Sequence, residues 1–310
     1  MTEEIANQGK SSPVVEKLNA FFATHQPDAR RIFHGRGQRY PGLEHLCIDW
    51  FGPLVLISAF AAIEDEGLLL EQILGADKHD QITAVMIQRR YEKGAPAELL
   101  SGSCEEQLIV AEDGLRYEVH PGRRQNVGLF MDMRLVRQWL AKNSSQRNVL
   151  NLFAYTCSLS VAALAGGASA VTNVDVSKTS IAWGQRNHEL NGQSLRQVKA
   201  IPHNLFTSWG RIKQFGRYDL VIIDPPTRQR GSFEADKNYA AVVKRLGSLC
   251  NPGAEIIACL NSPFLPVSFL TDLFAAHCPG ASFVEMMPAA PEYKDAQPER
   301  GLKICRYQFA

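Results

Sequence analysis

Tyr218-Asp-Leu-Val-Ile-Ile-Asp-Pro-Pro226 joins an apolar run to an acid and two prolines. The run has the length and composition of a buried strand, with the acid and the prolines at its carboxyl end. Open α/β sheets bind ligands outside the carboxyl ends of their strands, so this turn is expected to line a crevice. Proline lacks an N–H group and fixes φ, so the turn presents rigid carbonyl groups beside a carboxylate, which together accept hydrogen bonds from an amine. An ordinary strand end followed by a proline turn is the alternative.

Strand-like and helix-like segments alternate along the chain from residue 129 onward. Because such alternation is typical of βαβ units, it predicts a mostly parallel, doubly wound sheet. The last two strands are joined without a clear helix, which predicts that the final strand is antiparallel. The expected strands are 148–153, 170–175, 197–201, 218–223, 254–260, 281–287 and 303–309. The expected helices are 130–142, 159–165, 178–190, 204–214, 235–249 and 266–277.

A smaller α+β domain is expected before this sheet. Residues 1–12 are polar and are predicted to form a disordered tail, residues 13–125 the small domain, and residues 126–310 the doubly wound domain. The expected helices of the small domain are 14–23 and 64–74. Its expected strands are 31–33, 46–50, 54–58, 82–88, 107–111 and 115–120.

Composition excludes several classes of protein. The 310 residues carry a net charge of only +1, so nucleic-acid binding would need local basic patches rather than bulk charge. The polar N-terminus has no secretory h-region, and the longest apolar stretch, 53–63, is too short to span a bilayer. The 7 cysteines include no C-x-x-C pair, which indicates reduced thiols in a cytoplasm rather than a zinc site or disulfides. No metal site is expected.

The loop after the first strand of the sheet is the expected cofactor site. Strand 148–153 runs into Ala154-Tyr-Thr-Cys-Ser158 and then a helix, the position at which α/β folds hold a nucleotide-like ligand. The loop contains no glycine, whereas a dinucleotide fingerprint needs G-x-G-x-x-G, so the sequence argues against a pyrophosphate and against NAD. Asp175 ends the next strand, where a carboxylate accepts hydrogen bonds from ribose hydroxyls. Asn204, after the third strand, is placed to read adenine. Helix capping is the alternative for both side chains.

With these segments assembled, the chain resembles the class I S-adenosylmethionine-dependent RNA base methyltransferases, most closely the branch that acts on large-subunit ribosomal RNA. The resemblance implies a Rossmann-like seven-stranded α/β sheet with a smaller N-terminal α+β domain. It covers about residues 80–310 and is specific as a group of motifs. The segments that carry it are Asn126-Val-Gly-Leu-Phe-Met-Asp-Met-Arg134, Asn148 to Ala168, Val174 to Lys178, Asn187 to Gly192 and Ile223 to Thr227.

The resemblance also implies roles for individual residues toward S-adenosylmethionine. Arg134 would hold the carboxylate of the cofactor, and Asp224 would lie where the methyl donor meets the base. The other implied contacts are Asn151, Phe153 and Ala154 with the methionine part, Asp175 with Ser177 at the ribose, and Asn204 with Leu205 at the adenine.

Three positions depart from the family pattern. Cys157 replaces a small residue, usually glycine, and Asn204 stands where aspartate is commoner. Arg228 follows Asp-Pro-Pro-Thr where the family usually has an aromatic residue that stacks on the target base. Phe233 or Tyr239 is expected to take over that stacking, or the target differs.

Basic residues with aromatic neighbours predict an RNA surface, since arginine binds phosphates and rings stack on bases. Four arginines near the N-terminus, among them Arg36 and Arg39, alternate with Phe33, His34 and Tyr40. Four further arginines flank the motifs. The arginines of the predicted RNA surface are Arg30, Arg31, Arg36, Arg39, Arg123, Arg124, Arg228 and Arg230. An ordinary solvated surface is the alternative.

The sequence thus predicts a cytoplasmic enzyme that methylates an RNA base, with Asp224 and the Pro225 carbonyl orienting the nucleophile. Related enzymes that methylate cytosine C5 carry a cysteine where this chain has Asn261, and Cys259 is expected to be a core thiol. A base nitrogen is therefore the expected acceptor. A non-catalytic RNA-binding protein and an NAD-dependent oxidoreductase are the alternatives, and the sequence leaves monomer and homodimer open.

Overall fold

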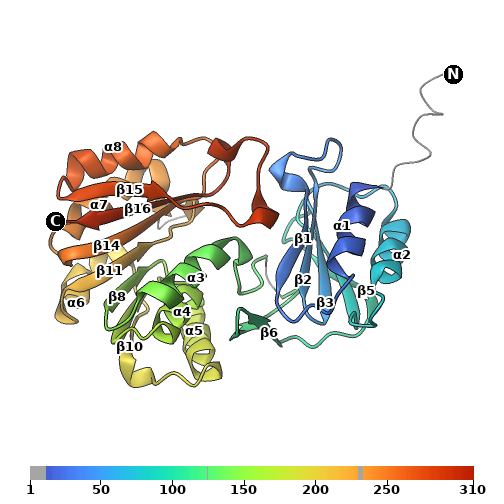
Figure 1. The fold of residues 1–310 in the computed structure, drawn as a ribbon, viewed down its shortest axis with the longest axis horizontal. Helices are drawn as coiled ribbons and strands as arrows, with labels where there is room; N and C mark the ends of the chain where they lie inside the picture. Colours follow the sequence, from blue (N-terminus) through green and yellow to red (C-terminus); the bar gives the residue numbers. More distant parts are fainter. Residues whose placement is uncertain (1–11, 124, 230–232) are drawn as a thin grey trace. The chain divides into compact units, whose positions relative to one another are not determined.

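The computed structural model describes residues 12–123, 125–229 and 233–310, which fall into two compact units (Figure 1). The first unit comprises residues up to 112 together with 119–127, and the second comprises 113–118 and 128–310. Apart from Ser12, the predicted tail lies outside the described residues, as do Arg124 and Arg230. Within the described residues, no helix is both long and apolar enough to cross a membrane.

The first unit is a mixed five-stranded sheet with two helices packed on one face (Figure 1). Its strands are β1 (Arg30–His34), β2 (Leu46–Phe51), β3 (Leu54–Ala59), β4 (Ala84–Arg89) and β5 (Ala97–Gly102), which lie in that order. β3 and β4 are parallel and the other neighbours are antiparallel, so β1, β3 and β4 run in the same direction. Helices α1 (Pro13–Phe21) and α2 (Glu66–Ala76) bury their apolar sides against the sheet.

The sequence did not predict β5, because Ala97-Glu-Leu-Leu-Ser-Gly102 has no β-branched residue and no buried position. The expected strands 107–111 and 115–120 form the two-stranded sheet β6 (Leu108–Glu112) and β7 (Leu115–Val119).

The second unit contains the predicted seven-stranded sheet, with strand order β10-β9-β8-β11-β14-β16-β15. The strands are β8 (Asn148–Leu152), β9 (Ala170–Val174), β10 (Val198–Ile201), β11 (Tyr218–Ile223), β14 (Cys250–Leu260), β15 (Ala281–Met286) and β16 (Lys303–Phe309). β16 is antiparallel to both of its neighbours, as expected from the helix-free connection before it. The central strands read as continuous apolar runs because helices cover both faces.

The sheet lies between two layers of helices, so the second unit has three layers (Figure 1). The helix expected at 130–142 begins as the 3-10 turn η3 (Met131–Met133). One core packs α3 (Arg134–Asn143) and α4 (Ser158–Ala165) on one face of the sheet. The opposite core packs α6 (Trp209–Gln214), α7 (Ala235–Leu246) and α8 (Val267–His277) on the other face. Helix α5 (Lys178–Leu190) joins β9 to β10.

The strand order reverses between β8 and β11, which are neighbours in the sheet. From β8 the chain moves outward to β9, and from β11 it moves outward to β14, so the two connections leave in opposite directions. Ligands of open α/β sheets bind outside the carboxyl ends of the strands at such a switch point. The residues that follow β8 and β11 are therefore the candidate site.

Candidate functional site

The loop after β8 adopts left-handed backbone conformations without glycine. Phe153, Tyr155 and Cys157 have φ values of 61°, 47° and 61°. Glycine takes up this conformation at no steric cost, whereas each side chain here strains the backbone. The sequence correctly showed that the loop lacks glycine, but not that it folds as a glycine loop would.

Hydrogen bonds from three directions hold this loop in place. The backbone N–H of Ala154 donates to the carbonyl of Val174 at 3.0 Å. The Thr156 hydroxyl donates to the carbonyl of Gly128 at 2.6 Å, and the Thr156 carbonyl accepts from the Asn187 amide at 2.9 Å. Gly128 and Asn187 lie in two of the segments that carry the family resemblance, so those segments help to hold the loop in place.

Asp175 lies at the end of β9, beside the loop. One carboxylate oxygen accepts the N–H of Tyr155 at 2.9 Å and the other accepts the N–H of Ser177 at 2.8 Å. Burial raises the pKa of Asp175, and the two backbone hydrogen bonds oppose the rise. Because each carboxylate oxygen has a second lone pair, both can still accept a hydroxyl. Ser177 caps α5 by accepting the N–H of Ser180 at 3.1 Å, so helix capping falls to Ser177.

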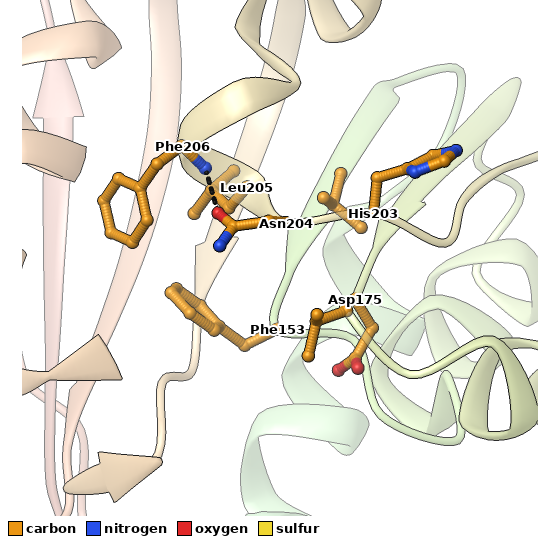
Figure 2. A pocket seen from close by; sticks show the side chains of 8 residues that line it. Phe153, Asp175, His203, Asn204, Leu205 and Phe206 are labelled. Carbon is orange, nitrogen blue, oxygen red and sulfur yellow. Dashed lines mark hydrogen bonds between the residues drawn. The ribbon is translucent and has the colours of Figure 1, made fainter. Parts of the chain in front are cut away.

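A solvent-open pocket of about 330 Å³ lies over these residues. Its lining residues are Phe153, Val174, Asp175, Val176, His203, Asn204, Leu205 and Phe206 (Figure 2). Asn204 accepts the N–H of Phe206 with its Oδ1 at 2.8 Å, which makes it a cap, while its Nδ2 points to the side of Phe153. The structure therefore brings together Phe153, Asp175, Asn204 and Leu205, four of the residues predicted to bind the cofactor.

Two predicted cofactor residues are engaged elsewhere. Asn151 is 1% exposed, and its Nδ2 donates to Asn173 at 3.1 Å, while its Oδ1 is buried and has no hydrogen-bond partner. Arg134 forms a two-pronged ion pair with Asp113 at 2.8 and 2.9 Å. A role for Arg134 at the cofactor carboxylate stays a prediction, and in that role the cofactor carboxylate would compete with Asp113 for the Arg134 guanidinium. Ala154, which was also predicted to contact the cofactor, is buried in the loop.

Asp224, directly after β11, belongs to a partly buried group of charges. Burial and the nearby Asp132 carboxylate raise the pKa of Asp224 to about 7, and the Cys259 thiol and the Arg137 guanidinium oppose the rise. Arg137 is 2% exposed, and its Nη1 lies 3.4 Å from the hydroxyl of Ser158, the first residue of α4. Neither Asp132 nor Arg137 was predicted from the sequence to belong to the site. Asp132 could have been found, because it lies within the segment from Asn126 to Arg134 that carries the family resemblance.

The turn after Asp224 is joined to the loop after β14. The Thr227 hydroxyl donates to the carbonyl of Asn261, so the two residues lie side by side. Behind this loop, the Lys303 ammonium group is buried and donates to the carbonyl of Ser262 at 2.6 Å and to that of Gly301 at 3.1 Å. The arrangement places Asn261 next to the Asp-Pro-Pro turn, on an anchored loop.

The structure contradicts the expectation that Phe233 or Tyr239 stacks on a base. Phe233 is 2% exposed, and its ring packs on Phe153 and Phe206 at centroid distances of 4.9 and 6.5 Å. Tyr239 is fully buried and donates its hydroxyl to the carbonyl of Cys259 at 3.0 Å. Both rings belong to the same core: Tyr239 lies on a buried position of α7, and Phe233 lies two residues before that helix begins. Arg228 is exposed and lies 3.3 Å from Glu234.

The arginines of the first unit fall into two groups. Arg30 is paired with Asp28 at 2.9 Å, and Arg31 is paired with Asp49 at 2.7 and 2.9 Å, so both ion pairs are internal to the unit. These two arginines are therefore wrongly grouped with an RNA surface. Arg36 and Arg39 are exposed, as the prediction requires.

A model of S-adenosylmethionine-dependent methyltransferases matches residues 30–308, most of the chain. The chain belongs to this family. The cofactor is therefore S-adenosylmethionine, and the alternative of an NAD-dependent oxidoreductase is set aside.

Known proteins resemble this methyltransferase to different extents. The ribosomal RNA large subunit methyltransferase K/L of Shewanella loihica is 36% identical over 200 residues, which are 63% of this chain and 27% of that protein. The chain thus spans about a quarter of that relative's length. A candidate S-adenosylmethionine-dependent methyltransferase from Streptococcus mutans has a TM-score of 0.80 at 23% identity, covering 96% of this chain and 82% of that one. The tRNA m1G37 methyltransferase of M. jannaschii has a TM-score of 0.59 at 15% identity, with 84% and 71% covered. These two share the fold.

The pocket of the methyltransferase fits the adenosine part of its cofactor. A carboxylate with free lone pairs, an amide Nδ2 and two apolar side chains suit a ribose and a purine. Asp175 would hold the ribose, and Asn204 with Leu205 would hold the adenine. Phe153 lines the same pocket, and its predicted contact with the methionine part stays a prediction.

Proposed function

We propose that this methyltransferase transfers a methyl group from S-adenosylmethionine to a nitrogen atom of an RNA base, in ribosomal RNA. The observation that carries the choice of a nitrogen is the pairing of Asp224 with Cys259. Cys259 is fully buried, and burial raises the pKa of its thiol well above the usual value, with Asp224 adding to the rise. A thiol in this state does not form the thiolate that methylation at carbon C5 requires.

When bound, S-adenosylmethionine supplies a methyl group that is open to direct displacement. The residues of this chain would act by positioning the acceptor. Asp224 and the Pro225 carbonyl would accept hydrogen bonds from an amino group of the base. Asn261, joined to the same turn through Thr227, would hold the opposite edge of the base. The base would have to be flipped out or unpaired to reach this turn.

Ribosomal RNA is proposed as the substrate because the Shewanella relative is named a ribosomal RNA large subunit methyltransferase. The M. jannaschii protein of the same fold is named for methylation of a guanine nitrogen in tRNA, which favours guanine only weakly. Residues 13–125 would form the part of the chain that grips RNA, residues 126–310 would carry the chemistry, and the protein would act in the cytoplasm.

Transfer of radiolabelled methyl groups from S-adenosylmethionine to protein-free large-subunit ribosomal RNA tests the proposal. Asp224→Asn should lower the turnover number by about 10-fold or more, since it removes an orienting hydrogen bond to a charged group, while cofactor binding stays intact. Binding of the cofactor without any transfer to RNA would instead support a non-catalytic RNA-binding protein.

A further inference from the structure

Three strand ends meet at one edge of the first unit's sheet. β1, β3 and β4 run in the same direction, so their carboxyl ends lie at the same edge. Arg36 follows β1 by two residues, Phe60 directly follows β3, and Arg90 directly follows β4. The topology thereby places an aromatic ring between two guanidinium groups that are distant in sequence.

Both guanidinium groups contact the same ring. The central carbon of the Arg36 guanidinium lies 4.1 Å from the centroid of Phe60, and that of Arg90 lies 5.4 Å from it. Cation–π attraction to a shared ring holds each cation in place. Arg36 is exposed, so a ligand can reach it from solvent.

Among the described residues, neither Arg36 nor Arg90 has an ion-pair partner. The charge of Asp49 acts on Arg90, but its carboxylate is already paired with Arg31 of β1. Arg90 donates through Nη1 to the side chain of Gln88 at 3.3 Å and to the carbonyl of Gln125 at 2.9 Å, both neutral. Its Nε is buried and lacks a hydrogen-bond partner. Two cations and an unused donor form a site that an anion would stabilise.

The turn that carries Arg36 packs closely against the loop that follows it. A Cβ at Gly35 would lie 1.8 Å from the carbonyl oxygen of Leu43 and 2.5 Å from that of Leu46. Because the Arg36 guanidinium already lies on the Phe60 ring, it loses less conformational freedom when it binds a ligand, which favours affinity.

We propose that Arg36, Phe60 and Arg90 form a binding site for a phosphate group of the RNA backbone. The inference rests on the proposed function, since RNA is the polyanion that this enzyme would have to grip. A guanidinium suits a phosphate because its planar fork matches the phosphate oxygens in pairs. The site fixes the position of the RNA and does not read its sequence.

Binding of fluorescently labelled, in vitro transcribed large-subunit ribosomal RNA, measured over a series of salt concentrations, tests the site. The variants are Arg36→Ala, Arg90→Gln and the two combined. Arg39→Ala is the matched control, because Arg39 is also exposed but has no aromatic partner among the described residues. The double variant should bind RNA about 10-fold or more weakly, and its salt slope should fall by about 1 to 2. Arg39→Ala should change both far less, and S-adenosylmethionine affinity should stay constant in all variants.

An unchanged affinity and salt slope in the double variant would overturn the site while leaving the proposed function standing. An effect of Arg39→Ala as large as that of Arg36→Ala would also overturn it, since any surface arginine would then serve. Methyl transfer by the wild-type protein is measured on the same RNA. If the wild-type protein binds the RNA but transfers no methyl group, the proposed function is refuted. The binding of the variants still tests the phosphate site in that case. A wild-type protein that does not bind this RNA overturns both.

Discussion

The sulfur atom of Cys157 occupies the space directly above Gly184, so a Cβ at Gly184 would lie 2.3 Å from it. Gly184 is a helical residue of α5, and Cys157 lies in the left-handed loop after β8. The cysteine that departs from the family pattern is thus accommodated by a glycine on the facing helix.

A larger residue at Gly184 should therefore destabilise the protein mainly through its clash with Cys157. Gly184→Ala should lower the free energy of unfolding by about 1–3 kcal/mol, since the core next to the loop is already filled. Cys157→Gly in the same chain should restore most of this loss, because glycine also suits the left-handed backbone. Gly210→Ala is the control, as a Cβ there meets no atom within 4 Å. Denaturant unfolding measures the wild type, Gly184→Ala, Cys157→Gly, the double variant and the control, and additive effects of the two substitutions would contradict the contact.

Stability should depend on pH through Asp224. Its pKa is about 7 in the folded protein and about 3.9 when unfolded. Between these values the folded state keeps a proton that the unfolded state has released, so the free energy of unfolding falls as pH rises from about 4 to 7. The fall should amount to a few kcal/mol at most. Unfolding of Asp224→Asn should lose this component, and parallel pH curves for variant and wild type would rule it out.

Asp175 should contribute to cofactor affinity through the ribose. Asp175→Ala should weaken S-adenosylmethionine binding by about 10- to 100-fold, since charge-assisted hydrogen bonds are lost. Asp175→Asn keeps the shape and separates the loss of charge from the collapse of the loop. Calorimetry gives both affinities. If neither variant changes the affinity, Asp175 supports only the backbone of Tyr155 and Ser177.

Much of the second unit could be predicted because its strands are buried on both faces and read as mostly apolar runs. The segments from Asn148 and Tyr218 are examples, whereas the order of the strands is known only from the structure. β5 was missed because its residues carry neither alternation nor β-branching. Left-handed φ at Phe153 was not visible either, since the surrounding hydrogen bonds, rather than local preference, impose it.

The site was predicted where it depends on strand ends and missed where it depends on side-chain packing. Asp175 and Asn204 line the pocket as expected, because their positions follow from the topology. Phe233 was wrongly placed at the surface, since its burial depends on contacts with Phe153 and Phe206, which are distant in sequence. Arg137 and Arg90 reach their sites only through tertiary contacts, so no local pattern marks them.

Identification of the methylated nucleoside tests the central claim most directly. RNA methylated by the wild-type enzyme and by Cys259→Ala is digested and analysed by mass spectrometry. The buried thiol of Cys259 and the exposed Asn261 predict a base methylated on nitrogen, formed by both proteins. Finding 5-methylcytosine with the wild type, and its loss in Cys259→Ala, would contradict the account.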